Sequence, residues 1–275
     1  MNKTIWLLWL QGWDHAPEIA DYCLQSWIKN NPEWKVVVLD RKNYSDWCDL
    51  DERLPSKNPN NIALSDLVRA SLLANHGGVW VDTTLWCNKP LDKWLEVKDS
   101  FFFTRGDPMF HMPSRPRVME NFFLAAQPNS YIFSQLYATL IAWWKWRIRE
   151  TDQFEHIYAP FNMCLGELFN KDRKARDILS TWTQIDVSHD NHGKHWGRGP
   201  HLLTPYHRSF NEPLSVDMKR RIDSKIDPLY KLTYKEGTSW RNPKQRGIHP
   251  DKEKIPLRVK KGSPIHYLLS HSSLL

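Results

Sequence analysis

Three charged side chains stand close together in the segment Ser65–Trp86, SDLVRASLLANHGGVWVDTTLW. Asp66 and Arg69 lie three residues apart, which suits an ion pair along a helix; on a solvated face such a pair is worth only about 0.3 kcal/mol. Asp82 directly follows the short apolar run 79–81. Ligands bind at the carboxyl ends of strands in open α/β sheets, so a carboxylate at this point is a candidate for binding chemistry.

A helix followed by a strand must position these charges. Gly77 and Gly78 end the helix, because glycine takes the left-handed conformation that closes a last turn. They predict a helix cap, since no phosphate-binding glycine pattern accompanies them. The run Val79–Val81 is β-branched and aromatic, which favours a strand. The helix itself is predicted from apolar positions at i, i+3, i+4 and i+7 spacing, namely Leu64, Leu67, Val68, Ser71 and Leu72.

The N-terminal residues predict the elements that come before this helix. Lys3–Leu10 is apolar and aromatic enough for a buried first strand, and Gln11 and Gly12 end it in a loop. A helix over 18–29 and a strand over 34–39 follow. Strand, helix, strand, helix and strand in succession indicate an α/β fold with a Rossmann-like half.

The segment Ser65–Trp86 resembles the core of the DXD-type sugar transferases of glycosyltransferase family 32, especially bacterial capsular polysaccharide synthesis proteins, and the large clostridial glucosylating toxins carry a similar core. The resemblance implies a GT-A-like, Rossmann-type nucleotide-binding core with a mostly helical acceptor-side part. Residues 1–112 would form the nucleotide-sugar-binding half. Residues 113–275 would form the acceptor-side helical region, with a C-terminal segment that returns to the donor site, within one integrated GT-A domain.

The resemblance also assigns roles residue by residue. Asp66 and Arg69 would hold the hydroxyls of the donor sugar, Trp80 would lie near the nucleoside, and Asp82 would be the first DXD carboxylate. Thr84 stands where the second carboxylate is expected. A neutral hydroxyl is a poorer ligand than a carboxylate for Mg²⁺ or Mn²⁺, so this departure weakens the expectation of tight metal binding.

Other segments resemble further parts of the donor site. Trp9 precedes a turn made of a polar residue and Gly. In the family that this chain resembles, the Trp at this position packs on the uracil of the donor. A Trp in an apolar run can equally fill the core. Residues 199–204 resemble a Gly-Pro...Thr turn beside the donor, and Lys231 and Lys235 could neutralise its diphosphate. The expected donor-binding residues are Trp9, Gln11, Ser65, Asp66, Arg69, Trp80, Asp82, Thr83, Thr84, Gly199, Pro200, Lys231 and Lys235.

Two roles remain for single residues near the reacting centre. Asn162 lies near a predicted helix start, and the resemblance makes it a candidate amide beside the reacting face of the sugar; a helix-start or surface Asn is the alternative. The expected catalytic residues are Asp66, Arg69, Asp82 and Asn162. The expected cofactor is a divalent metal, Mn²⁺ or Mg²⁺. Its ligands would be Asp82, Thr84 and His266, with Glu236 or Ser239 as alternatives to His266.

Downstream of residue 87 the sequence predicts further elements. Phe101–Phe103 indicates a core strand, and Asp107–His111 the next strand or turn. Arg117–Gln127 indicates a helix that ends before Pro128. Ile132–Arg149 indicates a helix with an apolar stripe and a cationic end. That end suits either contact with an anionic bilayer or a core helix whose last charges complement its dipole.

Composition limits the choice of compartment and partner. The 275 residues carry a formal net charge of +7, which suggests an anionic partner such as a nucleotide diphosphate, a lipid-linked acceptor, a membrane surface or nucleic acid. The four cysteines show no metal-ligand spacing and are expected to be reduced thiols. No apolar run suits a signal peptide or a membrane span. We therefore expect a cytoplasmic protein, with possible peripheral contact on the inner face of the membrane.

The predicted function is a retaining transfer of a hexose from a UDP-sugar to a hydroxyl of a capsular, O-antigen or other lipid-linked saccharide acceptor, which forms an α-glycosidic bond. Nucleic acid is not an expected partner. Two alternatives remain. The 15 tryptophans and the basic charge also fit a non-catalytic protein that binds polysaccharide or single-stranded nucleic acid by stacking. The missing second DXD carboxylate also fits a degenerate transferase without turnover.

Overall fold

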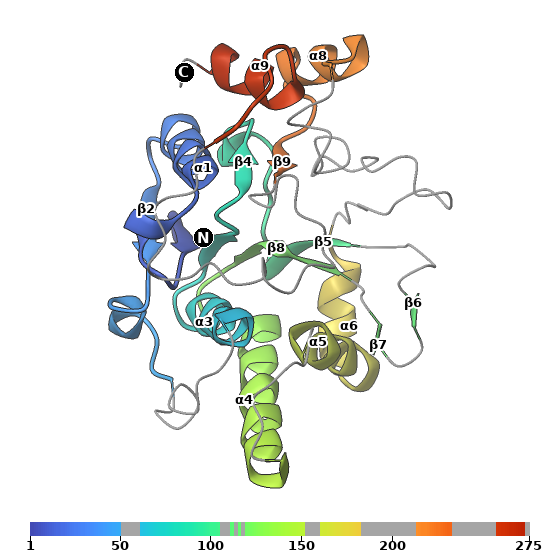
Figure 1. Ribbon diagram of the computed structural model, residues 1–275. Coiled ribbons are helices and arrows are strands. Elements are labelled where there is room, and N and C mark those ends of the chain that lie inside the picture. Colours follow the sequence, from blue (N-terminus) through green and yellow to red (C-terminus); the bar gives the residue numbers. More distant parts are fainter. Residues whose placement is uncertain are drawn as a thin grey trace.

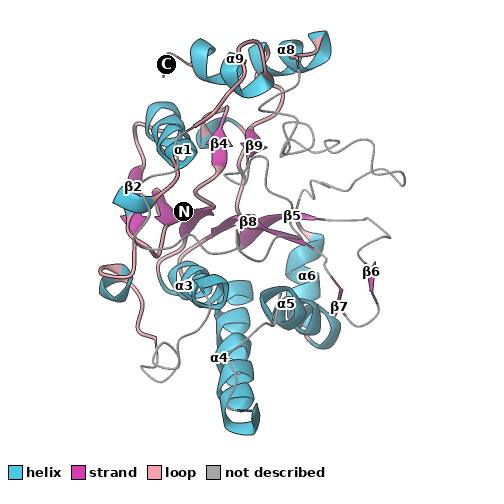
Figure 2. Cartoon of the chain, in the orientation of Figure 1, coloured by secondary structure: helices cyan, strands magenta, loops and turns pink. Residues whose placement is uncertain are grey.

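A five-stranded mixed sheet forms the centre of the molecule, and helices cover both of its faces (Figures 1 and 2). The computed structural model describes residues 1–50, 61–104, 111–112, 115–116, 119–151, 160–182, 213–232 and 257–272. The strand order in the central sheet is β2-β1-β3-β8-β5. The strands are β1 (Thr4–Leu8), β2 (Lys35–Leu39), β3 (Gly78–Val81), β5 (Ser100–Thr104) and β8 (Met119–Ala126).

The first three strands form the predicted Rossmann-like half. β1 pairs in parallel with both β2 and β3, and α1 (Glu18–Asn30) and α3 (Asn61–Asn75) connect them. β8 then runs antiparallel to both of its neighbours, β3 and β5. The predictions of an α/β fold with a Rossmann-type core and of a core strand at Phe101–Phe103 are therefore confirmed. β8 follows residue 112 in the chain yet lies inside this sheet, so both predicted parts contribute strands to it.

Side-chain alternation along the strands creates two cores. On one face, Trp6 and Trp80 belong to a cluster with α3, α4 (Tyr131–Thr151) and α5 (Pro160–Lys171). On the other face, Ile5 and Val79 pack with Trp27 of α1. In Figure 1, α3 to α6 lie below the sheet and α1 lies above it. Successive side chains in a strand point to opposite faces of the sheet, so neighbouring residues of each strand face different helical layers.

A small second sheet lies above the first. β4 (Leu85–Cys87) pairs antiparallel with β9 (Leu229–Lys231), and a third apolar cluster joins this sheet to α1, α8 and α9. The remaining elements are α6 (Arg173–Ser180), α8 (Val216–Asp223), α9 (Pro264–His271), β6 (His111–Met112), β7 (Arg115–Pro116) and the 3-10 helices Trp13–His15, Tyr44–Asp46 and Leu91–Lys93.

The helix predicted over Arg117–Gln127 is wrong, because Met119–Ala126 forms strand β8. Phe123 and Ala125 pack on one side of the central sheet, while Leu124 and Ala126 pack on the other. A strand buried on both faces shows no alternation of apolar and polar residues, so its short apolar run cannot be told from a buried helix by sequence. Of the strand or turn expected over Asp107–His111, only His111 lies within the described residues, where it begins β6.

The apolar stripe of α4 packs into the protein core. Ile132, Leu136, Leu140 and Trp144 are buried there, whereas Trp146 is about half exposed. This arrangement matches the core-helix alternative for the stripe. Among the described residues, no helix has the length and apolar character needed to cross a membrane.

The two glycines after α3 allow a close approach of backbones. Gly77 has φ 65° and Gly78 has φ 90°, both in the left-handed region that favours glycine. A Cβ on Gly78 would lie 2.5 Å from the carbonyl oxygen of Thr4 in β1. The predicted stop of the helix is confirmed, and Gly78 serves in addition as the first residue of β3.

We expect Gly78→Ala to lower the free energy of unfolding by about 3 kcal/mol, because backbone strain and a clash with Thr4 combine. Gly262→Ala is the matched control: its φ is 80°, but a Cβ there would meet no atom within 4 Å. Strain alone should cost that variant about 1 kcal/mol. Equilibrium urea unfolding measures both, and equal losses would contradict a role for the close β1–β3 contact.

Candidate functional site

Helix α3 buries both of its predicted charged residues. Only 2% of Asp66 and 6% of Arg69 is exposed, so the alternative of an ion pair on a solvated face is wrong. Nearly the whole helix from Ala63 to Ala74 is buried, because α3 packs against the sheet on one side and α4 on the other. A buried charge must find partners, since an uncompensated one is costly.

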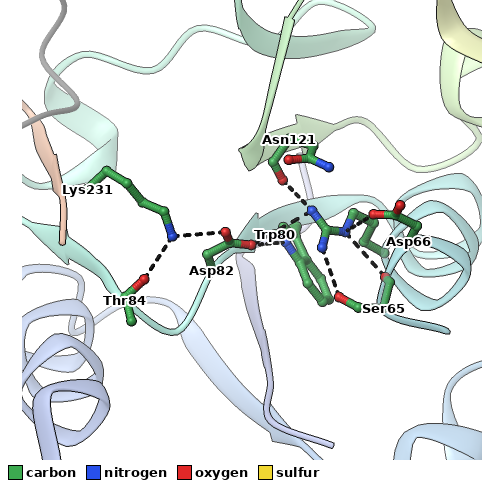
Figure 3. A network of polar contacts seen from close by, with 8 residues as sticks. Ser65, Asp66, Trp80, Asp82, Thr84, Asn121 and Lys231 are labelled. Carbon is green, nitrogen blue, oxygen red and sulfur yellow. Dashed lines mark hydrogen bonds and ion pairs between the residues drawn. The ribbon is translucent and has the colours of Figure 1, made fainter. Parts of the chain in front are cut away.

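Arg69 is held by contacts from three elements (Figure 3). Its Nη1 donates to the backbone oxygen of Asn121 in β8 at 2.6 Å, and its Nη2 donates to the Ser65 hydroxyl at 2.8 Å. The guanidinium lies 4.7 Å from the Trp80 ring and 5.9 Å from the Phe161 ring, distances that suit cation–π attraction. The side chain therefore links α3 to β3, β8 and α5.

Asp66 is less well satisfied than its partner. Its Oδ1 lies 3.4 Å from Arg69 Nε and is buried without a hydrogen bond. Burial raises the pKa of Asp66 to about 6; Arg69 opposes this rise and Asp82 adds to it. Asn162, next to Phe161 in the first turn of α5, also has a buried side-chain oxygen without a hydrogen bond. No described hydrogen bond or ion pair joins the Asn162 side chain to Asp66, Arg69 or Asp82, so the predicted place of Asn162 beside the cluster stays a prediction.

Asp82 lies at the exit of β3, as predicted. Its backbone N–H donates to Phe122 of β8 at 2.9 Å. Its Oδ1 accepts a hydrogen bond from Trp80 Nε1 at 3.3 Å and lies 3.8 Å from Arg69 Nη1. Its Oδ2 accepts one from Lys231 Nζ at 3.0 Å. Burial alone would raise the pKa of Asp82, but Lys231 and Arg69 outweigh it and hold this pKa below its ordinary value.

The small sheet brings Lys231 to this point. Lys231 is paired with Leu85 in the β4–β9 ladder, and Leu232 donates to the Thr84 carbonyl at 2.9 Å. The lysine Nζ also donates to the Thr84 hydroxyl at 2.8 Å, so one ammonium bridges Asp82 and Thr84 (Figure 3). A residue almost 150 positions further along the chain thereby completes the cluster.

The described residues do not fit a divalent metal between Asp82 and Thr84. The Lys231 ammonium already donates to an oxygen of each. A hard cation prefers several anionic or carbonyl oxygens, yet here one carboxylate faces two cationic side chains. Within the described ranges no group of three or more His, Cys, Asp or Glu could hold a metal ion.

The other predicted residues lie apart from this cluster or outside the described residues. Trp9 is buried in a small apolar cluster with Ala16 and Ala20, and Gln11 is partly exposed in the following turn. His266 lies in the first turn of α9, and no described hydrogen bond or ion pair joins its ring to Asp82 or Thr84. Gly199, Pro200, Lys235, Glu236 and Ser239 lie outside the described residues.

The structure brings together Ser65, Asp66, Arg69, Trp80, Asp82, Thr84 and Lys231 from the predicted set, with Thr83 buried in the same turn. It adds Asn121 and Phe161, which the sequence did not suggest. Asn121 contributes a backbone carbonyl, which leaves no signature in residue type. Its place in a strand was also obscured by the wrong helix assignment.

The tryptophans serve the core more than the surface. Among those in the described ranges, Trp6, Trp27, Trp80, Trp86 and Trp144 are at most 2% exposed. A stacking platform for polysaccharide or nucleic acid needs exposed ring faces. These five side chains therefore give no support to the non-catalytic binding alternative.

Fold and site together define an α/β protein with a Rossmann-type core and a cluster of charged side chains at the exit of β3. The family model described as "Capsular polysaccharide synthesis protein" matches residues 1–245, and the chain belongs to this family. The family predicted from the sequence is confirmed. The printed name of a curated relative agrees with the predicted class of enzyme, a glycosyltransferase.

One curated relative is the O-glycosyltransferase braB of Annulohypoxylon truncatum, 28% identical over 145 residues. The match covers 46% of this chain and 34% of the relative, so the chain spans about a third of that protein. Similar solved structures include the PaToxG glycosyltransferase, with TM-score 0.41 and 13% identity, covering 66% of this chain and 74% of that one. Mouse xyloside xylosyltransferase 1 gives TM-score 0.42 and 10% identity, covering 85% and 98%.

The buried carboxylate of Asp66 predicts a pH-dependent effect on stability. The pKa of Asp66 is about 6 in the folded chain, above the ordinary 3.8. Between these two pH values the folded chain therefore binds more protons than the unfolded chain, and the free energy of unfolding falls as pH rises. Asp66→Asn removes the titration. We expect its melting temperature relative to wild type to increase from about pH 4 to about pH 6 and then level off.

Thermal unfolding followed by circular dichroism measures this difference at each pH. Asp46→Asn, at an exposed position in the 3-10 helix Tyr44–Asp46, is the matched control. A constant offset for Asp66→Asn across the range would contradict the raised pKa.

Proposed function

We propose that this chain is a retaining glycosyltransferase that moves a hexose from a UDP-sugar to a hydroxyl of a capsular or other lipid-linked saccharide acceptor. One observation carries the proposal: Asp66, Arg69, Asp82 and Lys231 form one chain of ion pairs at the carboxyl end of β3, although Lys231 lies 149 positions beyond Asp82 in the sequence. Membership of the capsular polysaccharide synthesis family supports the same conclusion.

The buried acceptors suit a sugar. Asp66 Oδ1 and the Asn162 side-chain oxygen both lack hydrogen-bond donors, and sugar hydroxyls supply donors. Arg69 donates three of its five N–H groups to Ser65 and Asn121, and its Nη1 also faces Asp82, which leaves one N–H of Nη2 for a hydroxyl oxygen of the ligand. In this proposal, α3 and the start of α5 together clamp and orient the hexose.

The charges suit a departing diphosphate. Bond cleavage at the anomeric carbon places negative charge on the leaving phosphate, and a fixed cation near that position lowers the barrier. Lys231 supplies such a charge at the rim of the cluster, where its side chain is 15% exposed. We favour a front-face route with retention, in which the leaving phosphate accepts the proton of the acceptor hydroxyl. Trapping of a covalent glycosyl-enzyme would contradict it.

A thermal-shift screen with UDP-, GDP- and CMP-sugars tests the donor class. We expect UDP-sugars to raise the melting temperature, because a ligand that binds only the folded chain stabilises it by mass action. Stabilisation by GDP- or CMP-sugars instead would contradict the uridine assignment. Release of UDP during transfer or hydrolysis would exclude the degenerate transferase.

We expect Asp82→Asn to reduce the turnover of UDP-sugar by about a thousandfold or more, because it removes the charge that positions Lys231, Trp80 and Arg69. Asp217→Asn is the matched control, since Asp217 lies in α8 in an exposed ion pair with Arg220, away from the cluster. UDP release measured by a coupled assay reports both. Full turnover in Asp82→Asn would contradict this role of Asp82, whereas saccharide binding by wild type without any turnover would support the non-catalytic alternative.

A further inference from the structure

The cluster at the end of β3 contains its own cation where a DXD motif would place a metal. We propose that the ammonium of Lys231 takes the place of the divalent cation and binds the diphosphate of the donor directly, so that nucleotide binding needs no metal. This inference rests on the proposed function, because it concerns how the same site holds a nucleoside diphosphate.

The first argument is geometric. Asp82 and Thr84 are the first and third residues of the DXD-like triplet, and Lys231 Nζ lies 3.0 Å from Asp82 Oδ2 and 2.8 Å from Thr84 Oγ1. These are the two oxygens that a shared metal would need. A metal bound to both would have to share their lone pairs with an ammonium at hydrogen-bond distance, where cation–cation repulsion is strong.

The second argument is charge balance. The cluster contains two carboxylates, Asp66 and Asp82, and two cationic side chains, Arg69 and Lys231. Asp82 lies within 4 Å of both cations, and its Oδ1 also accepts from Trp80. The two cationic side chains already balance the two carboxylates, so little negative charge remains to bind a divalent ion. A monovalent ammonium needs fewer anionic ligands, and Thr84 in place of a carboxylate suits it.

The third argument is that backbone pairing holds Lys231 in place. Lys231 faces Leu85 in the β4–β9 ladder, and the Leu232 N–H bonds to the Thr84 carbonyl next in line. The backbone of the lysine is therefore tied to the same turn that its side chain contacts. This double attachment favours a fixed position for the charge over a mobile surface lysine.

The remaining hydrogen-bonding capacity of Lys231 suits a phosphate. An ammonium has three N–H donors, and the described contacts use two of them, on Asp82 and Thr84. The third is available to a phosphate oxygen, for which lysine acts as a compact point charge. The Lys231 side chain is 15% exposed and so is accessible to a ligand that approaches from solvent.

Isothermal titration of UDP into the full chain tests the proposal, with EDTA or with MnCl₂ in the buffer. We expect wild type to bind UDP with similar affinity in both buffers. Lys231→Met should weaken binding in EDTA by about tenfold or more, because the fixed charge is lost. Lys93→Met, an exposed lysine in the 3-10 helix Leu91–Lys93, is the matched control and should bind UDP as wild type does. Circular dichroism confirms that each variant is folded.

Manganese binding without nucleotide gives a second readout. We expect wild type to leave the electron paramagnetic resonance signal of free Mn²⁺ unchanged. The double variant Thr84→Asp with Lys231→Met restores two carboxylates at the triplet and removes the ammonium, so it should bind Mn²⁺ and reduce that signal.

The outcomes separate the two proposals. UDP binding by wild type that requires Mn²⁺, or stoichiometric Mn²⁺ uptake by wild type, would overturn the role of Lys231 and leave the transferase proposal intact. Unchanged UDP binding by Lys231→Met in EDTA would overturn it as well. Failure of folded wild type to bind UDP in either buffer would overturn the uridine donor and, with it, this inference.

Discussion

The buried guanidinium of Arg69 is the charge to which the other parts of the site are fitted. It needs oxygen and ring partners on every side because it lies almost entirely out of water. Ser65 supplies them from its own helix, Asn121 from β8 and Trp80 from β3. Satisfying this one group therefore fixes the distance between α3 and two strands, and with it the separation of Asp66 from Asp82.

Much of the site is set by backbone arrangement and not by residue type. The exit of β3 places Asp82, the glycines before it allow β1 to approach, and the β4–β9 ladder delivers Lys231. A side chain that points into the cluster does so because its strand is paired in one register; a shift by one residue would turn it to the opposite face. The chemistry of the site thus depends on the register of two sheets.

The sequence predicted local structure better than long-range pairing. The first three strands, their two helices and the charged residues of α3 and β3 follow from periodicity and caps, which are local signals. β8 was mistaken for a helix because Phe122 to Ala126 is apolar on both faces, and only its neighbours β3 and β5 determine its form. The contact of Lys231 with Thr84 joins residues 147 apart, and no local pattern encodes such a pairing. Resemblance to a family suggested Lys231, but not its position between the two oxygens.

The pairing of β9 with β4 has a consequence for the order of events during synthesis. Strands β1 to β5 and helix α3 belong to the first 104 residues, so Asp66, Arg69 and Asp82 emerge from the ribosome together. Lys231 emerges much later, and contacts between residues so far apart in sequence form slowly. Of the two cationic side chains that contact Asp82, Arg69 alone has been synthesised by then. The cluster therefore reaches charge balance only when β9 has joined the fold.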